Sequence, residues 1–435
     1  MKKSRAERAG QENGGRKVRA VALAAAVSLG AALAFTGLMS GPAAGVKAAG
    51  PAVKIGALLP LTGGLAPFGP ALQHAAELAV AQVNAEGGLW SGQPLQLVIR
   101  DTQTSPQPAI DSATKLVTLD RVPAVVGPFA SGEVAAVASA VTIPQGVLLI
   151  TPSATAPSIT NLADKDLVFR TTSSDALQGR VMGQVAYEAG YRKVAVIYEN
   201  TDYGQGQARY FAGEFEARGG KVTASVPFET GKASYRGELQ RAASGSPQAL
   251  LIIAYPDTGG ITILRQAVEE GFFDKFLFTD GMQTSDLAKA VGASVLEGAL
   301  GSGPQANPNA PTLKAFRAAY QARFGEPPLE QPFVASTYDA TFLIALALER
   351  AKVAKGESIR DSLRAVANAP GEPIYPGEWA KAKQLIDAGK DIDYVGASGP
   401  VEFDAKGDIM VATVGVWRFH NGEIVTDRII TARSE

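Results

Sequence analysis

From residue 52 onward, short apolar runs alternate with longer segments in which apolar residues recur every three or four positions. Short runs rich in Val, Ile and Leu are typical of buried strands, whereas the longer spacing is typical of amphipathic helices. The run 53–58 predicts the first strand, and the segment from Pro70 to the stop at Gly87-Gly88 predicts the first helix. Because helical segments separate the strands, the pattern predicts crossover connections and parallel sheets covered on both faces.

The alternation occurs twice along the chain. The first series predicts strands over residues 53–58, 95–100, 122–126 and 147–150, with helices near 109–119 and 131–141. The second series predicts strands over residues 193–198, 221–226, 249–254 and 276–279, with helices near 175–189, 205–218, 235–243 and 260–270. Two series of similar length predict two doubly wound α/β lobes rather than one large sheet.

The C-terminal part of the chain predicts a return to helix followed by a hairpin. Helical spacing recurs over 311–324 and 336–351. Two apolar runs, 408–419 and 423–430, flank Asn421-Gly422, a favoured two-residue hairpin turn. The stretch 370–399 has no regular pattern and is expected to be irregular.

Polar and aromatic residues follow the predicted strands of both series. In open parallel sheets, ligands lie beyond the carboxyl ends of the strands. The residues in these positions are Phe68, Ser131, Ser153 and Thr155 in the first series and Tyr203, Tyr255 and Asp280 in the second. If the lobes face each other, hydroxyls line one wall of a cleft, and aromatic rings with one carboxylate line the other. Such a cleft suits a small zwitterion.

The composition excludes several classes of site. With 46% apolar and 19% charged residues in a chain of 435, the protein is expected to fold into a packed core. The absence of Cys excludes disulfides, thiolate nucleophiles, iron–sulfur clusters and Cys-based zinc sites. Two widely separated His residues argue against a histidine metal centre. No nucleophile–base pair is recognisable, so we expect neither a cofactor nor enzymatic activity.

The first 48 residues have the build of an export signal. They carry eight basic and two acidic residues, and the run 20–46 is uncharged and ends in small residues. The step Val46-Lys47-Ala48 offers a small-x-small cleavage site; an uncleaved membrane anchor is the alternative. Either way, the folded part is expected outside the cytoplasm. The rest of the chain is acidic and has no basic stripe with aromatics, so nucleic acid is not an expected partner.

Several short motifs then identify a family. They are Pro60-Leu61-Thr62-Gly63, Phe68-Gly69, Val83-Asn84-Ala85-Glu86-Gly87-Gly88, Val126-Gly127-Pro128, Thr151-Pro152-Ser153-Ala154-Thr155, Phe169-Arg170-Thr171-Thr172, Tyr203-Gly204-Gln205-Gly206 and Phe403-Asp404-Ala405-Lys406-Gly407-Asp408. In these motifs and their order, the chain resembles the extracytoplasmic leucine/isoleucine/valine-binding proteins of ABC transporters, which are type I periplasmic binding proteins. The resemblance implies two flavodoxin-like lobes joined by three crossovers. It places residues 52–172 and 303–400 in lobe 1 and residues 173–302 and 401–435 in lobe 2.

The resemblance also implies roles for the first-lobe residues. Ser131 matches the hydroxyl that binds the ligand carboxylate, Ser153 a residue with main-chain contacts, and Thr155 one that uses its amide and hydroxyl. Phe68 stands where a Tyr is common and would line the side-chain pocket. Structural alternatives exist: Ser131 as a helix cap and Phe68 as a core residue.

For the second lobe, the resemblance implies an aromatic cover and an acid. Tyr203 matches an aromatic residue that covers the ligand, and Tyr255 matches another if a small gap is allowed. Asp280 falls where the family has an acidic residue for the ammonium, which in well-known members is the longer Glu. The alternative for Asp280, which precedes Gly281, is an ordinary turn former.

The predicted function is capture of an amino acid, branched-chain or similar, for an ABC importer. The partners implied are the ligand and the importer's permease, and the protein is expected to act as a monomer. Two alternatives remain open: a sensor protein for an amide or an aromatic carboxylate, and, more remotely, an exported enzyme on the same fold.

Overall fold

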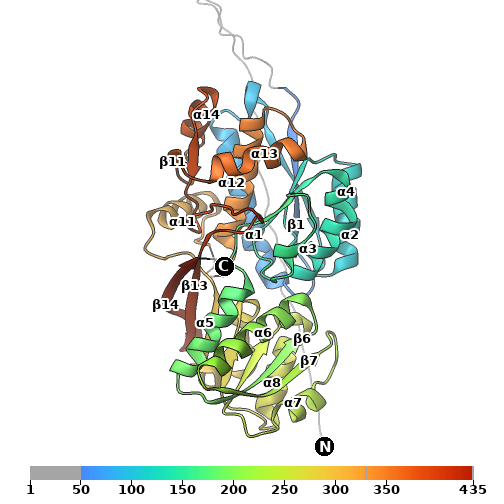
Figure 1. Ribbon diagram of the computed structural model, residues 1–435, viewed down its shortest axis with the longest axis vertical. Helices are drawn as coiled ribbons and strands as arrows, with labels where there is room; N and C mark the ends of the chain where they lie inside the picture. Colours follow the sequence, from blue (N-terminus) through green and yellow to red (C-terminus); the bar gives the residue numbers. More distant parts are fainter. Residues whose placement is uncertain (1–49, 329–330, 434–435) are drawn as a thin grey trace, which may run out of the picture. The chain divides into compact units, whose positions relative to one another are not determined.

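Two sheets organise the computed structural model, which describes residues 50–328 and 331–433 (Figure 1). The first sheet contains five parallel strands in the order β2-β1-β3-β4-β5. Their bounds are β1 Val53–Leu59, β2 Leu95–Asp101, β3 Ala124–Val126, β4 Leu148–Thr151 and β5 Val168–Arg170. The three inner strands are almost entirely buried, as expected for a parallel sheet with helices on both faces.

The second sheet has seven strands in the order β14-β13-β10-β9-β8-β6-β7. The bounds are β6 Lys193–Glu199, β7 Lys221–Phe228, β8 Ala249–Ile253, β9 Phe276–Phe278, β10 Leu300–Pro304, β13 Val411–His420 and β14 Glu423–Arg433. β6 to β10 are parallel, and β13 and β14 are added as an antiparallel hairpin. Asn421 and Gly422 both have positive φ, as the predicted two-residue turn requires.

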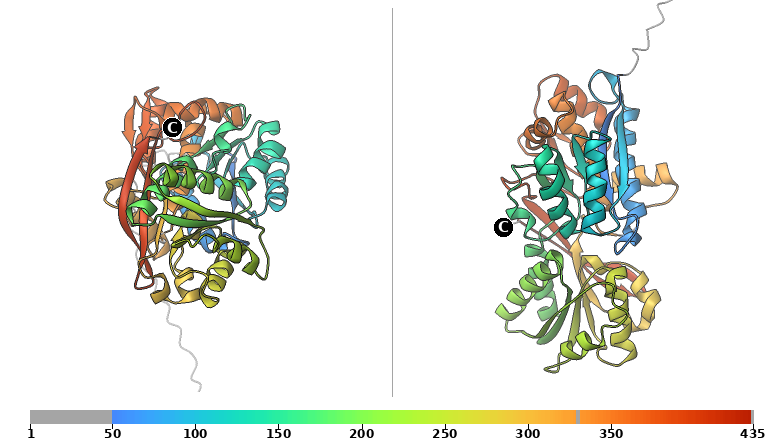
Figure 2. Two further views of the ribbon diagram at one scale, coloured as in Figure 1. Left: turned by 60° about the horizontal axis from the view of Figure 1, so that its bottom comes forward. Right: turned by 90° about the vertical axis from the view of Figure 1, so that its right-hand side faces the viewer.

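Helices cover both faces of the first sheet, as the views in Figures 1 and 2 show. One face packs against α1 Gly69–Ala85, α12 Val334–Ala351 and α13 Gly356–Ala367, and the other against α2 Pro106–Thr118 and α3 Ser131–Val137. The short α4 Ile143–Gln145, α11 Pro311–Phe324 and α14 Trp379–Asp387 complete this part. The sheet is therefore wound on both sides, as the alternating sequence predicts.

The second sheet is covered in the same way. On one face lie α5 Asp175–Glu188 and α6 Asp202–Ala217, and on the other α7 Arg236–Ala242 and α8 Ile261–Glu269, with α9 Asp286–Val291 and α10 Ala293–Leu296 nearby. Phe211 and Phe215 of α6 stack on each other with centroids 5.3 Å apart and fill the α5/α6 side. Two doubly wound lobes are thus present in the described chain.

The chain passes between the two sheets three times, after β5, after β10 and before β13. A buried ion pair ties the first and third passages together: Arg170 Nε lies 2.6 Å from Asp408 Oδ1, and Arg170 Nη2 lies 2.7 Å from Asp408 Oδ2. The lobe boundaries expected near 172, 303 and 400 stay a prediction, and the one at 303 falls inside β10.

Three expectations about elements need correction. The stretch 370–399 is not irregular, because it contains α14 and a two-stranded parallel sheet of β11 Glu372–Ile374 and β12 Ile392–Tyr394. α14 has a long-range anchor in Trp379, which is fully buried and whose indole donates to the carbonyl of Gly88 at 3.1 Å. β13 begins at Val411 rather than at 408, because Asp408 is drawn into the ion pair with Arg170.

The third correction concerns α6, which begins at Asp202 rather than near 205. Thr201 caps it, its side chain accepting a hydrogen bond from the main-chain N–H of Gly204 at 3.3 Å. Tyr203 consequently lies in the first turn of a helix and not in a loop. The predicted export segment, 1–48, lies outside the described residues. Within those residues, no helix combines the length and apolarity that a membrane crossing requires.

Candidate functional site

A pocket of about 340 Å³ of empty space lies where the carboxyl ends of strands from both sheets meet. It is lined by Leu65, Phe68, Phe129, Ser131, Ser153, Thr155, Tyr203, Tyr255, Asp280, Gly281 and Phe333. The structure thus brings together all seven residues singled out from the sequence. Their roles toward a ligand stay predictions.

Ser131 opens α3 but does not cap it. The N-cap position belongs to Ala130, whose main-chain N–H donates to Glu133 Oε2 at 3.1 Å. Burial raises the pKa of Glu133 to about 7. Ser131 Oγ instead accepts a hydrogen bond from the main-chain N–H of Ala156 at 3.1 Å. Because that bond uses a lone pair, the hydroxyl proton of Ser131 is available for a ligand acceptor.

The loop after β4 supplies the rest of the first-lobe wall, and Arg170 holds it from behind. Arg170 Nη1 donates to the carbonyl oxygens of Thr155 and Ala156 at 3.2 and 3.1 Å. Ser153 Oγ donates to the carbonyl of Phe129 at 2.8 Å, so its hydroxyl proton is already used. The first-lobe wall is therefore neutral, and its side chains are hydrogen-bonded to main-chain groups of the same lobe. Arg170 fixes the orientation of two peptide groups.

The second-lobe wall begins with two stacked tyrosines. The rings of Tyr203 and Tyr255 lie 5.2 Å apart at an angle of 11°. The hydroxyl of Tyr203 lies 2.8 Å from Thr279 Oγ1, accepts from the N–H of Gly281 at 3.2 Å and lies 3.1 Å from Asp280 Oδ1. The tyrosine thus both lines the pocket and fixes the turn that carries the acid.

Asp280 is buried at the carboxyl end of β9 with neutral partners. Its Oδ1 accepts from Gln178 Nε2 at 2.6 Å, besides the contact with Tyr203. Burial raises the pKa of Asp280 to about 6. Neither Lys nor Arg is among the described residues that line the pocket. The carboxylate therefore has hydrogen bonds but no cation beside it, which is the arrangement that an ammonium group would complete.

A second carboxylate lies behind the first. Asp175 is fully buried; burial, followed by the charge of Asp280, raises the pKa of Asp175 well above its ordinary value. Gln207 Nε2 donates to Asp175 Oδ1 at 2.7 Å and lies 3.5 Å from Asp280 Oδ1. Asp175 Oδ2 has no hydrogen-bond partner among the described residues. The second lobe thus brings two acids into one low-dielectric region.

Sequence reasoning missed this supporting layer. Asp175 is the first residue of α5, which is capped by Ser174, whose Oγ accepts from the N–H of Ala176 at 3.3 Å. Gln178 follows Asp175 by three positions and Gln207 follows Tyr203 by four, so each amide shares a helix face with a site residue. An isolated polar residue on an otherwise apolar helix face was the signal that could have found them.

The two lobes touch over the pocket. Ser158 Oγ donates to Asp202 Oδ2 across the lobes at 3.1 Å. Gly64 approaches the second lobe so closely that an added Cβ would lie 2.3 Å from Thr258 Cγ2. These contacts describe a closed cleft.

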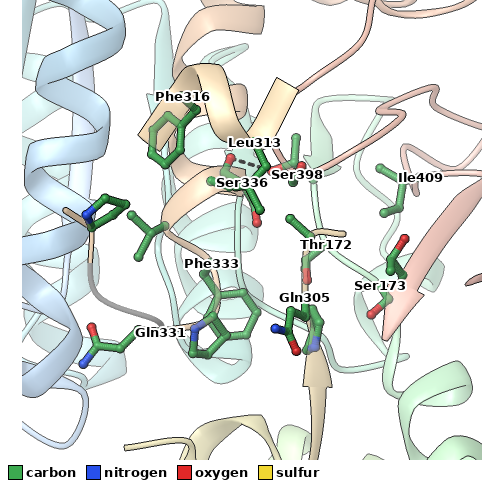
Figure 3. Close-up of a pocket in the computed structure, with 18 of the residues that line it drawn as sticks. Thr172, Ser173, Gln305, Leu313, Phe316, Gln331, Phe333, Ser336, Ser398 and Ile409 are labelled. Atoms are coloured by element: carbon green, nitrogen blue, oxygen red, sulfur yellow. Dashed lines mark hydrogen bonds between the residues drawn. The ribbon is translucent and has the colours of Figure 1, made fainter. Parts of the chain in front are cut away.

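A second cavity, larger than this pocket at about 830 Å³, lies at the passages between the lobes (Figure 3). It shares Phe333 with the ligand pocket and contains none of the seven predicted residues. Polar groups and strand ends converge on the smaller pocket, so that pocket is the better candidate site. A search of the described residues finds no group of three or more His, Asp or Glu side chains that could hold a metal ion.

The chain is similar to known proteins over most of its length. Residues 52–413 match the family described as Periplasmic binding protein. A leucine-, isoleucine-, valine-, threonine- and alanine-binding protein of Pseudomonas aeruginosa is 32% identical over 336 residues, which cover 77% of this chain and 87% of the relative. A chemotactic signal transduction system substrate-binding protein of Halobacterium salinarum is 28% identical over 365 residues, covering 82% and 84%.

A solved structure extends the likeness to the fold. The substrate-binding protein of a branched-chain amino acid transporter from Streptococcus pneumoniae, in complex with isoleucine, superimposes with a TM-score of 0.72 at 26% identity. The match covers 88% of this chain and 99% of the other.

Proposed function

Because the chain belongs to the branched-chain amino acid group of the periplasmic binding protein family, we propose that it binds a branched-chain or similar aliphatic α-amino acid between its two lobes. Members of this family are substrate-binding proteins that act outside the cytoplasm. The observation that carries the proposal is the pairing of walls: neutral hydroxyls of the first lobe face a buried carboxylate of the second.

Each end of the zwitterion has a matching group. The ligand carboxylate accepts hydrogen bonds from the hydroxyl of Ser131 and from Thr155. Ser131 Oγ at the same time accepts from the main-chain N–H of Ala156. The ligand ammonium donates to Asp280, where a charge-assisted hydrogen bond contributes about 1.5–3 kcal/mol. Tyr203 and Tyr255 cover the ligand. Because closure removes water from both charged ends, each must find a fixed partner in the pocket.

The side-chain end of the pocket is apolar. Leu65, Phe68, Phe129 and Phe333 all line it. Phe68 and Phe129 are 2% and 3% exposed, so Phe68 belongs both to the core and to the pocket wall. An aliphatic side chain gains free energy by burial against these groups, at roughly 25 cal/mol per Å² of apolar surface. A polar side-chain end would be buried there without a partner.

Scanning fluorimetry on the chain that begins at Ala49 tests the proposal. At one hundred times its dissociation constant, a ligand adds about 2.7 kcal/mol to the stability of the protein. We expect leucine, isoleucine and valine to raise the melting temperature, and benzoate and acetamide to leave it unchanged. A response to benzoate or to an amide, with none to any α-amino acid, would replace the proposed ligand class.

We further infer that the protein is exported by residues 1–48, acts as a monomer without chemical turnover and delivers its ligand to the permease of an ABC importer. The mass of the secreted protein identifies the cleavage site, and light scattering gives the oligomeric state. Mass spectrometry of the ligand recovered from the protein tests turnover: a changed mass would favour an enzyme.

The Halobacterium relative favours a second candidate function, presentation of the bound ligand to a chemotaxis receptor. Both functions share the binding step, so affinity does not separate them. Deletion of the gene separates the two functions. Loss of labelled leucine uptake supports delivery to an importer, whereas loss of movement toward leucine with uptake unchanged supports the sensor.

A further inference from the structure

The large cavity lies where the lobes are joined, and we call it the hinge cavity (Figure 3). It is bounded by the passage after β5, the passage after β10, the start of α12 and the segment before β13. With about 830 Å³ of empty space, it is more than twice as large as the ligand pocket at about 340 Å³. The ligand pocket therefore adjoins a larger cavity.

Phe333 is the single described residue that lines both cavities. It has φ of 72°, a left-handed conformation that is rare for a bulky residue and is often found at ligand sites. Its carbonyl oxygen accepts from the N–H of Thr337 at 2.9 Å and from Thr337 Oγ1 at 2.7 Å, which anchors the main chain at the start of α12. The ring is thus held as a partition between two spaces.

The hinge cavity carries polar oxygen atoms that have no hydrogen-bond partner in the described protein. They are Thr172 Oγ1, Ser173 Oγ, Gln283 Oε1, Gln305 Oε1 and Gln331 Oε1, and all five residues line the cavity. Thr172, Ser173 and Gln283 are only 3%, 2% and 4% exposed. The three amide oxygens require donors, and the two hydroxyls can either donate or accept, since leaving buried polar atoms unpaired is unfavourable.

The charge of the lining decides which donors fit. Among the described residues that line the hinge cavity, Arg317 is the one charged side chain and none is acidic, so a cationic group would meet a like charge and no counter-charge there. Amide oxygens and hydroxyls instead complement an uncharged donor, such as a carboxamide or a hydroxyl. Leu313, Phe316 and Ile409 supply apolar surface for the carbon chain that carries such a donor.

We propose that Phe333 is the residue that restricts the ligand pocket to short apolar side chains, and that the hinge cavity behind it is a side-chain subsite for amino acids ending in an uncharged donor. This inference rests on the proposed function. With the Phe333 ring in place, a carboxamide would be buried against apolar groups. Without it, the same carboxamide reaches both space and acceptors. Rejection of glutamine-like ligands then depends on one ring.

Calorimetric titration of the wild type and Phe333→Ala with leucine and glutamine tests the inference. We expect the wild type to bind leucine and to reject glutamine. In Phe333→Ala, affinity for glutamine rises at least about tenfold, the value of one or two added hydrogen bonds, while affinity for leucine falls about tenfold through lost apolar contact. Phe333→Leu, which keeps an apolar side chain on α12, should show a smaller gain and serves if the Ala variant does not fold.

Phe68→Ala is the matched control. Phe68 lines the ligand pocket but not the hinge cavity, so its removal should weaken leucine binding without admitting glutamine. Adding Ser173→Ala and Gln283→Met to Phe333→Ala should cancel the glutamine gain. An equal gain in Phe68→Ala, or none in Phe333→Ala and Phe333→Leu with leucine still bound, would overturn the inference. A wild type that binds no aliphatic amino acid would instead refute the proposed function.

Discussion

The two walls of the ligand pocket are built on opposite principles. The first-lobe wall is neutral, and its hydroxyls are bonded to main-chain groups of the protein itself: Ser131 to Ala156 and Ser153 to Phe129. The second-lobe wall buries Asp280 and Asp175 with amide and phenol partners but no cation in the pocket. The first wall is neutral and held by its own main chain, whereas the second wall holds carboxylates without a cation.

This difference separates two tasks. A preorganised neutral wall recognises a carboxylate with little rearrangement, because hydrogen bonds already hold Ser131 and the Thr155 loop in place. An anionic wall in a low dielectric is unfavourable in the empty protein, and an incoming ammonium removes that penalty. We therefore expect substitutions in the first wall either to destabilise the protein or to lower ligand affinity modestly. Replacement of the acid in the second wall should lower ligand affinity and raise the stability of the empty protein.

The largest expected effect is on the support of the first wall. Arg170→Met removes the guanidinium that holds the Thr155 loop and leaves Asp408 buried and unpaired. Loss of one partner of a buried ion pair destabilises a protein by about 3–5 kcal/mol. Denaturant unfolding measures this loss in the free energy of unfolding. As the control, Arg218→Met breaks an exposed pair with Glu214 and should change stability by less than about 1 kcal/mol. Equal effects would show that Arg170 has no special structural role.

Replacing the acid of the second wall should affect affinity and stability in opposite directions. Asp280→Asn keeps an oxygen for Gln178 and Tyr203 but removes the charge, so leucine affinity falls about a hundredfold. The ligand-free variant gains about 1–3 kcal/mol at pH 7.5, because a buried ionised group is lost. Calorimetry and denaturant unfolding measure the two quantities. Asp286→Asn, on the surface of α9, serves as the control. Unchanged leucine affinity in Asp280→Asn would place the ammonium elsewhere.

The pH dependence of binding sharpens the same contrast. The pKa of Asp280 in the folded protein, about 6, lies above the ordinary value of 3.8 for an Asp side chain, so folding favours the protonated form. Its contribution to the stability of the empty protein is complete below about pH 3.8 and is lost as the pH rises through 6. Leucine requires the ionised form, so its affinity is constant above about pH 7 and falls by up to about tenfold per unit below 6.

Calorimetric titrations between pH 5 and 8 measure this profile. Ser131→Ala should shift the whole curve without changing its shape, because a neutral hydroxyl does not titrate. A flat profile in the wild type would contradict the role of Asp280.

The smallest expected effect distinguishes two hydroxyls of the first wall. Ser131→Ala removes a proton that is available to the ligand and should lower leucine affinity about tenfold. In Ser153→Ala, the lost hydroxyl proton was already donated to Phe129, so affinity should change less than about threefold. Calorimetric titration of both variants with leucine measures the two affinities. A larger loss in Ser153→Ala would mean that Ser153, not Ser131, is the carboxylate donor.

The sequence predicted the parts of the site that local pattern determines. Strand ends are readable from apolar runs, and parallel topology brings them to one edge, so all seven candidate residues line one pocket. A polar residue on an apolar helix face could have marked Asp175, Gln178 and Gln207 as candidates, but their partners depend on the packing of α5 against α6, which local spacing does not encode. Phe333 escaped for another reason. Its position depends on a left-handed residue between two passages of the chain, and a propensity scale disfavours that conformation for Phe.

The most direct test of the central claim compares leucine with two analogues that each lack one charge. Calorimetric titration at pH 7.5 with leucine, 4-methylpentanoate and leucinamide keeps the aliphatic side chain and removes the ammonium or the carboxylate in turn. If the two walls bind the two ends of a zwitterion, both analogues bind at least about a hundredfold more weakly than leucine. Binding of 4-methylpentanoate as tight as that of leucine would contradict the account, because Asp280 would then have no ammonium to meet.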